Sequence, residues 1–292
     1  MARPAVVLAL ALSLGCGPAA AGAAEPSSPS GDAAVSAEAS AQEGGVRAVL
    51  TYREGLGGPL PYFDLKLAIT SSGTPAYEQP VSSHRCPSGC EPGTLEIAQS
   101  KRSPVAVTDL EGNGHANVVL ELSTGGAHCC AVVQVLTYDP GTMAYLLAEH
   151  DFGDPGALLK TIEGDPHPVF ESGDDRFAYE FGSYADSAFP LEVLGFQQGR
   201  FVNVTRSFPK QVAAQAATLF RGFREGRRHG EGLGALAAWA ADEDLLGRGV
   251  LVTQTLNREA RLHNLRSAEG QSAAGQAFVA KLERFLKRTG YT

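Results

Sequence analysis

Alternation of apolar and polar residues dominates residues 46–206. The alternation is clearest in three segments, 62–69, 117–122 and 201–204, and each has the pattern of a strand with one buried face. Turns rich in Gly, Pro and Asp separate such segments, and the Gly-Gly pair within residues 123–127 suits a tight hairpin. The pattern predicts an antiparallel all-β domain of about a dozen short strands.

The periodicity changes after Pro209, where apolar residues recur at the spacing of a helix. Three series have this spacing: Val212, Ala216, Leu219, Phe220 and Phe223; Leu233, Leu236, Ala237 and Ala240; and Phe278, Val279, Leu282, Phe285 and Leu286. A weaker series is Leu251, Leu256 and Leu262, so we expect about four helices. Trp239 is interpreted as a packing anchor on an Ala-rich helix. The predicted fold class is α+β, with a β domain at 46–207 and an α-helical region at 208–292.

The N-terminal residues have the pattern of an export signal. Arg3 precedes an apolar run, residues 5–14, that is too short to span a bilayer and suits the core of a signal peptide. We therefore expect residues 1–23 to be a signal peptide. Residues 24–45 consist largely of Ala, Gly, Ser, Pro and Glu, and Val35 is their one large apolar residue, so they predict a flexible low-complexity linker.

Two routes of processing stay open for this exported chain. Cys16 follows Leu-Ser-Leu-Gly, a permissive form of the bacterial lipobox, and lipidation there would make an outer-membrane lipoprotein. The Ala-x-Ala pattern at residues 21–23 instead predicts ordinary cleavage and a free periplasmic or extracellular protein. We expect contact with a membrane only through such a lipid anchor.

Composition and charge narrow the classes of partner. The chain has 292 residues, of which 43% are hydrophobic and 19% charged, as in soluble globular proteins. Its formal net charge of −8 divides unevenly, because residues 46–206 hold 10 basic and 20 acidic side chains whereas residues 207–292 hold 13 basic and 8 acidic. The acidic β region argues against a nucleic-acid partner. The opposite charges indicate two regions that attract each other, or only solvated surface.

One short segment has the spacing of a calcium-binding loop. In residues 109–117, DLEGNGHAN, oxygen-bearing side chains stand at positions 1, 3, 5 and 9, and Gly114 stands at position 6. Alternate side chains turn inward around Ca²⁺ in such a loop, and Gly permits the sharp bend. The expected ligands of a weak, structural Ca²⁺ site are the side chains of Asp109, Glu111, Asn113 and Asn117 and the backbone carbonyl of His115. The alternative is an acidic turn that binds nothing.

This loop resembles the calcium loops of FG-GAP repeats, the units of integrin α-chain β-propellers and of many secreted bacterial proteins. The longer segment 105–130, which ends in Thr-Gly-Gly-Ala-His-Cys-Cys, is similar to a group of uncharacterised exported bacterial proteins with such VCBS-type loops. The resemblance implies blade-like β units of about fifty residues, and residues 161–169 form a fainter second copy of the loop. Because the β region has room for about three units, we expect a propeller-like arrangement that does not close.

Four cysteines follow the expected signal peptide, namely Cys86, Cys90, Cys129 and Cys130. In an exported chain this even number predicts two disulfides. Neighbouring residues of a strand point to opposite faces, so the favoured bridges run from Cys129 and Cys130 to the loop that holds Cys86 and Cys90. The alternative is a zinc or copper site made of His84, Cys86, Cys90, His128 and either Cys129 or Cys130.

The leading functional hypothesis is a non-catalytic exported binding or envelope-structural protein. Its β module would be stabilised by Ca²⁺, and its partner would be a protein or another component of the cell envelope. One alternative is a secreted hydrolase of unknown substrate, although no G-x-S-x-G or H-E-x-x-H motif is present and the acidic pairs Asp174/Asp175 and Asp151/Asp154 are typical of solvated turns. The other is a thiol or metal-handling protein centred on His128, Cys129 and Cys130. No catalytic residue is assigned.

Overall fold

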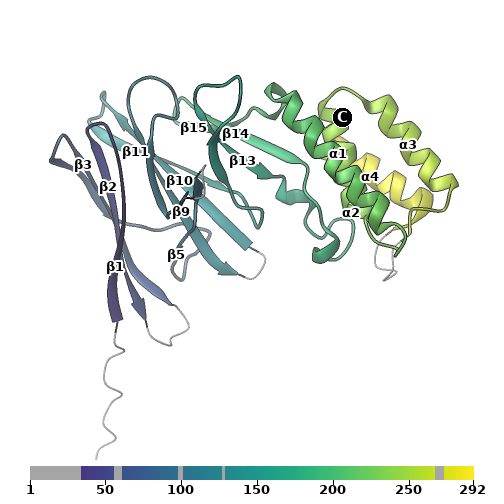
Figure 1. The fold of residues 1–292 in the computed structure, drawn as a ribbon. Coiled ribbons are helices and arrows are strands. Elements are labelled where there is room, and N and C mark those ends of the chain that lie inside the picture. Colours follow the sequence, from purple (N-terminus) through teal and green to yellow (C-terminus); the bar gives the residue numbers. More distant parts are fainter. Residues whose placement is uncertain (1–33, 56–60, 98–100, 127–128, 267–272) are drawn as a thin grey trace, which may run out of the picture.

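The computed structural model describes residues 34–55, 61–97, 101–126, 129–266 and 273–292. Within these ranges fifteen strands form three sheets, and four α-helices follow them in the chain. Figure 1 shows the sheets side by side, with the helices gathered at the end of the molecule that lies farthest from β1. The predicted α+β class, with the strands first and the helices last, is confirmed.

The first sheet is a meander of four antiparallel strands, each paired with the next one in sequence. Its strands are β1 (Ala34–Glu43), β2 (Val46–Gly55), β3 (Tyr62–Ser71) and β4 (Thr74–Pro80). Alternate residues of β3 are buried, namely Leu65, Leu67 and Ile69. This one-sided burial is what the apolar alternation along residues 62–69 predicts.

Strand β1 differs from the sequence-based prediction. Its residues belong to the segment that composition assigns to a flexible linker, yet they pair with β2 along the whole strand, from Ala34 opposite Gly55 to Glu43 opposite Val46. The pattern is hidden because the inward-facing residues are small: Ala39 and Ala41 pack against the core. The ordered β region therefore begins by residue 34 rather than at residue 46.

The other two sheets are built from shorter and less regular strands. The second has the order β11 (Ala144–Asp151), β10 (Cys129–Asp139), β9 (Asn117–Gly126), β5 (Glu91–Pro92), and β8 (Val105–Thr108) also pairs with β9. The third has the order β15 (Arg200–Asn203), β14 (Leu191–Gln197), β13 (Pro168–Gly173), β12 (Leu158–Thr161), β6 (Glu96–Ile97), β7 (Lys101–Arg102). Only the pairing of β12 with β6 is parallel among the described strands. None of the three sheets closes within the described ranges, as predicted.

Strand β9 lies between two hydrophobic cores and is buried on both faces, so the prediction of a single buried face for residues 117–122 is wrong. Val118 packs with Leu67 and Ile69 of the first sheet. Val119, which points the other way, packs with Phe170 and other residues of the third sheet. A strand covered on both faces has a continuous apolar run instead of a strict alternation, and this explains the sequence Val-Val-Leu at residues 118–120.

The helical region consists of α1 (Pro209–Gly226), α2 (Leu233–Leu245), α3 (Gly249–Arg261) and α4 (Gly275–Thr289). The four helices match the number expected from the apolar spacing, and Trp239 is buried against Phe220, as a packing anchor should be. Phe177 and Phe181, which precede α1 by about thirty residues, complete this helical core. In the described part of the chain, no helix has both the length and the apolar character required to cross a bilayer.

Buried polar groups join the helices to the third sheet. The carboxylate of Asp242 in α2 accepts a hydrogen bond from the backbone N–H of Leu191 in β14 at 3.0 Å. Both carboxylate oxygens of Asp174 accept hydrogen bonds from the Arg176 guanidinium, and Oδ2 also accepts one from the hydroxyl of Tyr291, beyond α4, at 2.7 Å. The second oxygen of Asp242 is buried without a protein partner. Burial raises the pKa of Asp242 to about 8.

The substitution Asp242→Asn should stabilise the protein by an amount that grows between pH 5 and pH 8. The folded wild type keeps the Asp242 proton up to about pH 8, whereas the unfolded chain loses it near pH 4, so wild-type stability falls as the pH rises through this range. The slope is at most about 1.4 kcal/mol per pH unit. The asparagine cannot ionise and keeps an oxygen for Leu191. Urea denaturation at both pH values measures the difference, and the same substitution at Asp139, at the β10–β11 turn, serves as a control. An advantage for Asp242→Asn that stays constant with pH would contradict this assignment.

Candidate functional site

The Asp109 loop, residues 109–117, connects β8 to β9 and is closed by its own first side chain. Asp109 Oδ1 accepts hydrogen bonds from the backbone N–H groups of Gly112 at 2.7 Å, Glu111 at 3.2 Å and Asn113 at 3.3 Å. Asp109 Oδ2 accepts one from Gly114 at 2.7 Å. Partial burial acts to raise the pKa of Asp109, but these four amides outweigh it and hold the pKa below its ordinary value.

The backbone of the loop depends on glycine at two positions. Gly112 and Gly114 have φ angles of +67° and +81°, which L-residues with a side chain rarely adopt. A Cβ atom on Gly112 would also lie 1.8 Å from Nε2 of His167, which comes from the turn between β12 and β13. That turn lies within residues 161–169, whose sequence resembles the loop, so the two segments lie against each other.

The last residue of the loop is part of the core. Asn117 is 1% exposed, its Oδ1 accepts a hydrogen bond from the N–H of Leu110 at 3.0 Å, and its Nδ2 donates one to Oγ1 of Thr137 at 2.8 Å. The asparagine thus satisfies a buried amide at the start of the loop and ties the loop to β10.

The loop also bridges the first and third sheets. Glu43, at the end of β1, accepts a hydrogen bond from the N–H of Asp109 at 3.2 Å. Glu111 accepts one from the N–H of Gly199, in the turn between β14 and β15, at 3.3 Å. With the packing of His167 on Gly112, the loop therefore contacts turns from both neighbouring sheets.

The structure brings together some of the predicted calcium ligands and separates others. Asp109, Asn113 and the His115 carbonyl belong to the exposed arch of the loop, where Asn113 Oδ1 accepts the N–H of His115 at 2.8 Å. Glu111 reaches outward to Gly199, and Asn117 turns into the core. The hydrogen bonds are those of a self-closed acidic turn. An ion would share these oxygens with the backbone amides.

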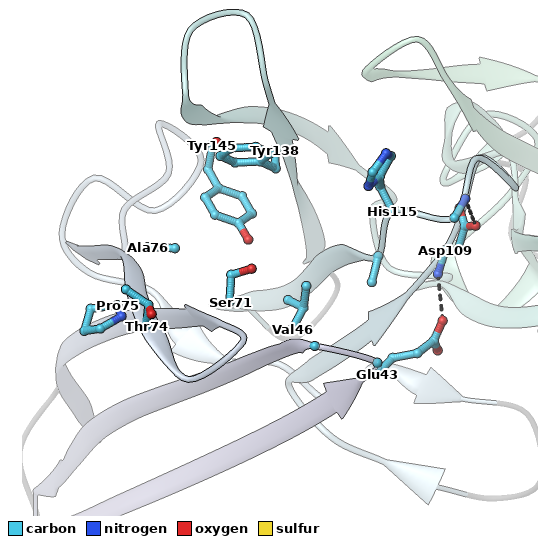
Figure 2. A pocket seen from close by; sticks show the side chains of 14 residues that line it. Glu43, Val46, Ser71, Thr74, Pro75, Ala76, Asp109, His115, Tyr138 and Tyr145 are labelled. Carbon is cyan, nitrogen blue, oxygen red and sulfur yellow. Dashed lines mark hydrogen bonds between the residues drawn. The ribbon is translucent and has the colours of Figure 1, made fainter.

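A cavity of about 480 Å³ adjoins the loop. Figure 2 shows Tyr138 and Tyr145 on one side of it and Glu43, Asp109 and His115 on the other. The remaining lining comes from the turns of the first sheet, including Val46, Ser71 and Pro75, and from Gly114 and Ala116 of the loop. The sequence contains no sign of this cavity, because its residues come from four separate turns and only one of them, the Asp109 loop, has a recognisable motif.

A second cavity, of about 590 Å³, lies at the other end of β9 and is lined by carboxylates. Glu121 is 6% exposed and accepts a hydrogen bond from the N–H of Thr94 at 3.0 Å. Burial raises the pKa of Glu121 to about 7, against the lowering effect of that N–H. The sequence did not predict that Glu121 is buried beside a cavity, because the residue stands among the apolar residues of β9 without any motif.

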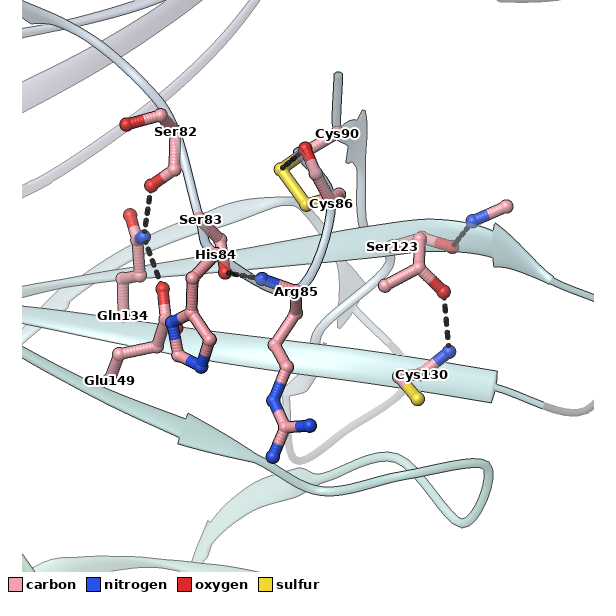
Figure 3. Close-up of a disulfide and its surroundings, with 12 residues drawn as sticks. Ser82, Ser83, His84, Arg85, Cys86, Cys90, Ser123, Cys130, Gln134 and Glu149 are labelled. Carbon is pink, nitrogen blue, oxygen red and sulfur yellow. Dashed lines mark hydrogen bonds and ion pairs between the residues drawn. A yellow bond between two sulfur atoms is a disulfide. The ribbon is translucent and has the colours of Figure 1, made fainter. Parts of the chain in front are cut away.

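The cysteines pair differently from the favoured prediction. Cys86 forms a disulfide with Cys90, at a Cα–Cα distance of 5.1 Å, so the expected bridges from these two residues to Cys129 and Cys130 are wrong. Figure 3 shows this bond. Both cysteines are buried in a core that also holds Leu50 of the first sheet and Leu122 of the second. A bridge within one turn closes only a short loop, which the spacing of four residues allows.

The proposed zinc or copper cluster loses its thiolates, because Cys86 and Cys90 are oxidised and Cys130 also forms a disulfide. The side chain of His84 instead lies 3.0 Å from Glu149 (Figure 3). His128 and the side chain of Cys129 lie outside the described residues, as do Cys16 and the expected signal peptide. Among the described residues, no group of three His, Cys, Asp or Glu side chains is arranged to hold a metal ion.

The acidic pairs considered for hydrolysis have structural partners. Asp174 binds Arg176 and Tyr291, and Asp151 forms an ion pair with Arg85 at 3.1 Å. Asp175 accepts a hydrogen bond from the N–H of Asp154 at 3.4 Å, and burial raises the pKa of Asp175. Their arrangement gives no assignment of a catalytic acid and base.

Comparison with known proteins finds one similar curated protein, whose description names a cellular compartment. The chain is 31% identical over 162 residues to a probable thylakoid lumen protein of Synechocystis sp.. The aligned region covers 53% of this chain and 48% of that protein, so the chain spans about half the length of the curated relative it matches. No family model matches the sequence, and the resemblance to FG-GAP repeats therefore rests on the loop residues alone. No solved structure matches it either.

The substitution Asp109→Ala should lower the free energy of unfolding by about 1–2 kcal/mol, because four amides lose their acceptor and only solvent can replace it. Asp109→Asn keeps one carbonyl oxygen and should cost less. Denaturant unfolding in the presence of a chelator measures both. The matched control is Asp139→Ala, in the exposed β10–β11 turn, where the carboxylate accepts the N–H of Gly141. Equal stability of Asp109→Ala and wild type would mean that the carboxylate does not hold the loop.

Tryptic mapping without reduction should find Cys86 and Cys90 bonded within a single peptide, residues 86–101. This peptide should be lighter than its reduced form by the mass of two hydrogen atoms. A cross-linked pair made of this peptide and peptide 103–160, which holds Cys129 and Cys130, would instead restore the inter-segment bridges. Mapping of the fully reduced protein provides the control.

Proposed function

We propose that this chain is an exported, non-catalytic protein whose β region is stabilised by weak Ca²⁺ binding at the Asp109 loop. The observation that carries the proposal is the position of this loop, which has calcium-type spacing and hydrogen-bonds to turns of the first and third sheets through Glu43 and Gly199. Ca²⁺ binding would make the loop more rigid. It would thereby strengthen the contacts that the loop makes with the first and third sheets, in addition to the loop itself.

Export is supported by two independent observations. The similar protein of Synechocystis sp. is described as a probable thylakoid lumen protein, and the lumen is a compartment outside the cytosol. The disulfide between Cys86 and Cys90, together with that of Cys130, suits an oxidising compartment. Both agree with the signal-peptide pattern at residues 1–23.

A binding role is supported by the surface of the β10–β11 hairpin. Tyr138, Met143, Leu146 and Leu147 are between 43% and 79% exposed. Leu146 and Leu147 are consecutive in β11 and point to opposite faces of the hairpin, so exposed apolar side chains are available on both faces for contact with another molecule. We therefore expect the β region to contact a partner in the cell envelope.

The residues of the loop can offer oxygens to an ion. Asp109 Oδ2 accepts a single amide, and Glu111 uses one of its two oxygens for Gly199, so each carboxylate retains a lone pair. The amides that surround Asp109 also keep it ionised, as a ligand must be. The ion would neutralise the negative charge of the two carboxylates. Because the loop has only two carboxylate ligands, the affinity for Ca²⁺ should be weak, with Kd about 10⁻⁴–10⁻³ M.

Millimolar Ca²⁺ should raise the melting temperature, and a chelator should reverse the increase. At free Ca²⁺ about one hundred times Kd, the added stability would be about 2.7 kcal/mol. Glu111→Gln keeps an oxygen for Gly199 but removes half of the ligand charge, so it should reduce the increase while the melting temperature in chelator stays close to that of wild type. Differential scanning calorimetry measures both quantities.

Asp139→Asn is the matched control, and it should leave the calcium effect intact. Magnesium at the same concentration controls for ionic strength, since Mg²⁺ keeps its waters and prefers a stricter octahedral site. A melting temperature that does not change with Ca²⁺ would mean that the loop is only an acidic turn.

A further inference from the structure

The cavity beside the Asp109 loop has an aromatic wall. The rings of Tyr138 and Tyr145 lie with their centroids 5.6 Å apart at an interplanar angle of 62°, so they form an angled surface. Tyr77 packs edge-on against Tyr145 at 5.9 Å and supports it. Tyr138 is 43% exposed, and solvent can therefore reach this wall. Burial raises the pKa of Tyr145, which keeps its hydroxyl protonated.

The opposite wall has negative charge. Glu43 and Asp109 line it, joined by the hydrogen bond from the N–H of Asp109, and His115 lies beside them (Figure 2). Glu43 is exposed at the end of β1 and uses one oxygen for this bond, so its charge stays available to a ligand. No Lys or Arg side chain is among the described residues that line the cavity. Val46, Pro75 and Ala116 contribute apolar surface between the walls.

We propose that this cavity binds an organic ammonium ion, a cation with apolar substituents on nitrogen. Tyrosine rings attract such a cation through the negative charge above their faces, and the site excludes water from the alkyl groups at the same time. The carboxylate of Glu43 adds a long-range attraction that a neutral ligand of equal shape would not feel. An anion is disfavoured by both carboxylates. The inference does not depend on calcium binding by the loop.

A bare metal ion fits this cavity less well than an organic cation. A metal needs several convergent oxygen ligands, and among the described lining residues only Glu43 and Asp109 offer carboxylate oxygens to the cavity. The described part of the cavity offers no cluster of three ligating side chains. An organic ammonium ion, whose charge is spread over its alkyl groups, requires only aromatic and apolar contacts and one negative charge nearby.

The test uses choline and its neutral isostere, 3,3-dimethylbutan-1-ol, titrated in turn into the full-length protein in the presence of a chelator. Isothermal titration calorimetry and ¹H NMR of the ligand methyl groups follow binding. Choline should bind saturably, and the alcohol should bind at least about tenfold more weakly, because it has the same shape without the charge.

Two variants locate the binding site. Tyr138→Leu removes an exposed ring and should weaken choline binding about tenfold, with a smaller effect on the alcohol. Glu43→Gln keeps an oxygen for the Asp109 amide and should weaken choline binding while leaving the alcohol unaffected. Tyr184→Leu, which replaces a tyrosine outside the cavity, is the matched control and should bind choline like wild type.

Circular dichroism and the melting temperature establish that each variant is folded, and Glu43→Gln provides an independent test if Tyr138→Leu is not. Equal affinity for choline and the alcohol would overturn the proposal, because the cavity would then recognise only shape. Absence of saturable choline binding by wild type at tens of millimolar would overturn it as well. So would choline binding that survives both Tyr138→Leu and Glu43→Gln.

Discussion

The capture of four backbone amides by Asp109 is the interaction on which the junction of the β region depends. A single carboxylate fixes the arch of the loop, and the fixed arch then presents the N–H of Asp109 to Glu43 and the side chain of Glu111 to Gly199. Without this local closure the turns of the first and third sheets would share no polar contact through the loop. The carboxylate stays ionised because its hydrogen bonds stabilise the charged form.

The three sheets are held by the double-sided burial of β9 as well as by the loop. Val118 and Val119 point into different cores, so a change in either core is transmitted through one strand. The segment before β5 is fixed to the second sheet in a similar way: Gln134 donates to the carbonyl of Ser82 at 2.8 Å, and the disulfide of Cys86 and Cys90 covers the adjoining core. Polar contacts at the edges and apolar contacts inside thus specify the same arrangement.

Sequence patterns predicted the elements that have strong periodicity. The four helices and strands such as β3 follow directly from apolar spacing, and the loop from 109 to 117 follows from its oxygen and glycine positions. Strand β1 was not predicted, because alanine contributes little to an apolar pattern. The Cys86–Cys90 pairing was not predicted, because the spacing of cysteines alone does not determine their connectivity. The burial of Glu121 and the aromatic wall of Tyr138 and Tyr145 were not predicted for another reason: both arise from tertiary contacts between segments that are distant in sequence.

The aromatic residues shared between the two regions determine how this chain can evolve. Phe177 and Phe181 belong to the β region in sequence, but they fill the core beneath α4 through ring contacts with Phe285 at 4.8 and 5.2 Å. Recombination at the boundary near residue 208 would separate these rings from the helices that cover them, leaving apolar surface exposed on both products. The helical region is therefore not a portable module. It must be inherited together with the segment that precedes β14, and the two are expected to diverge as one unit.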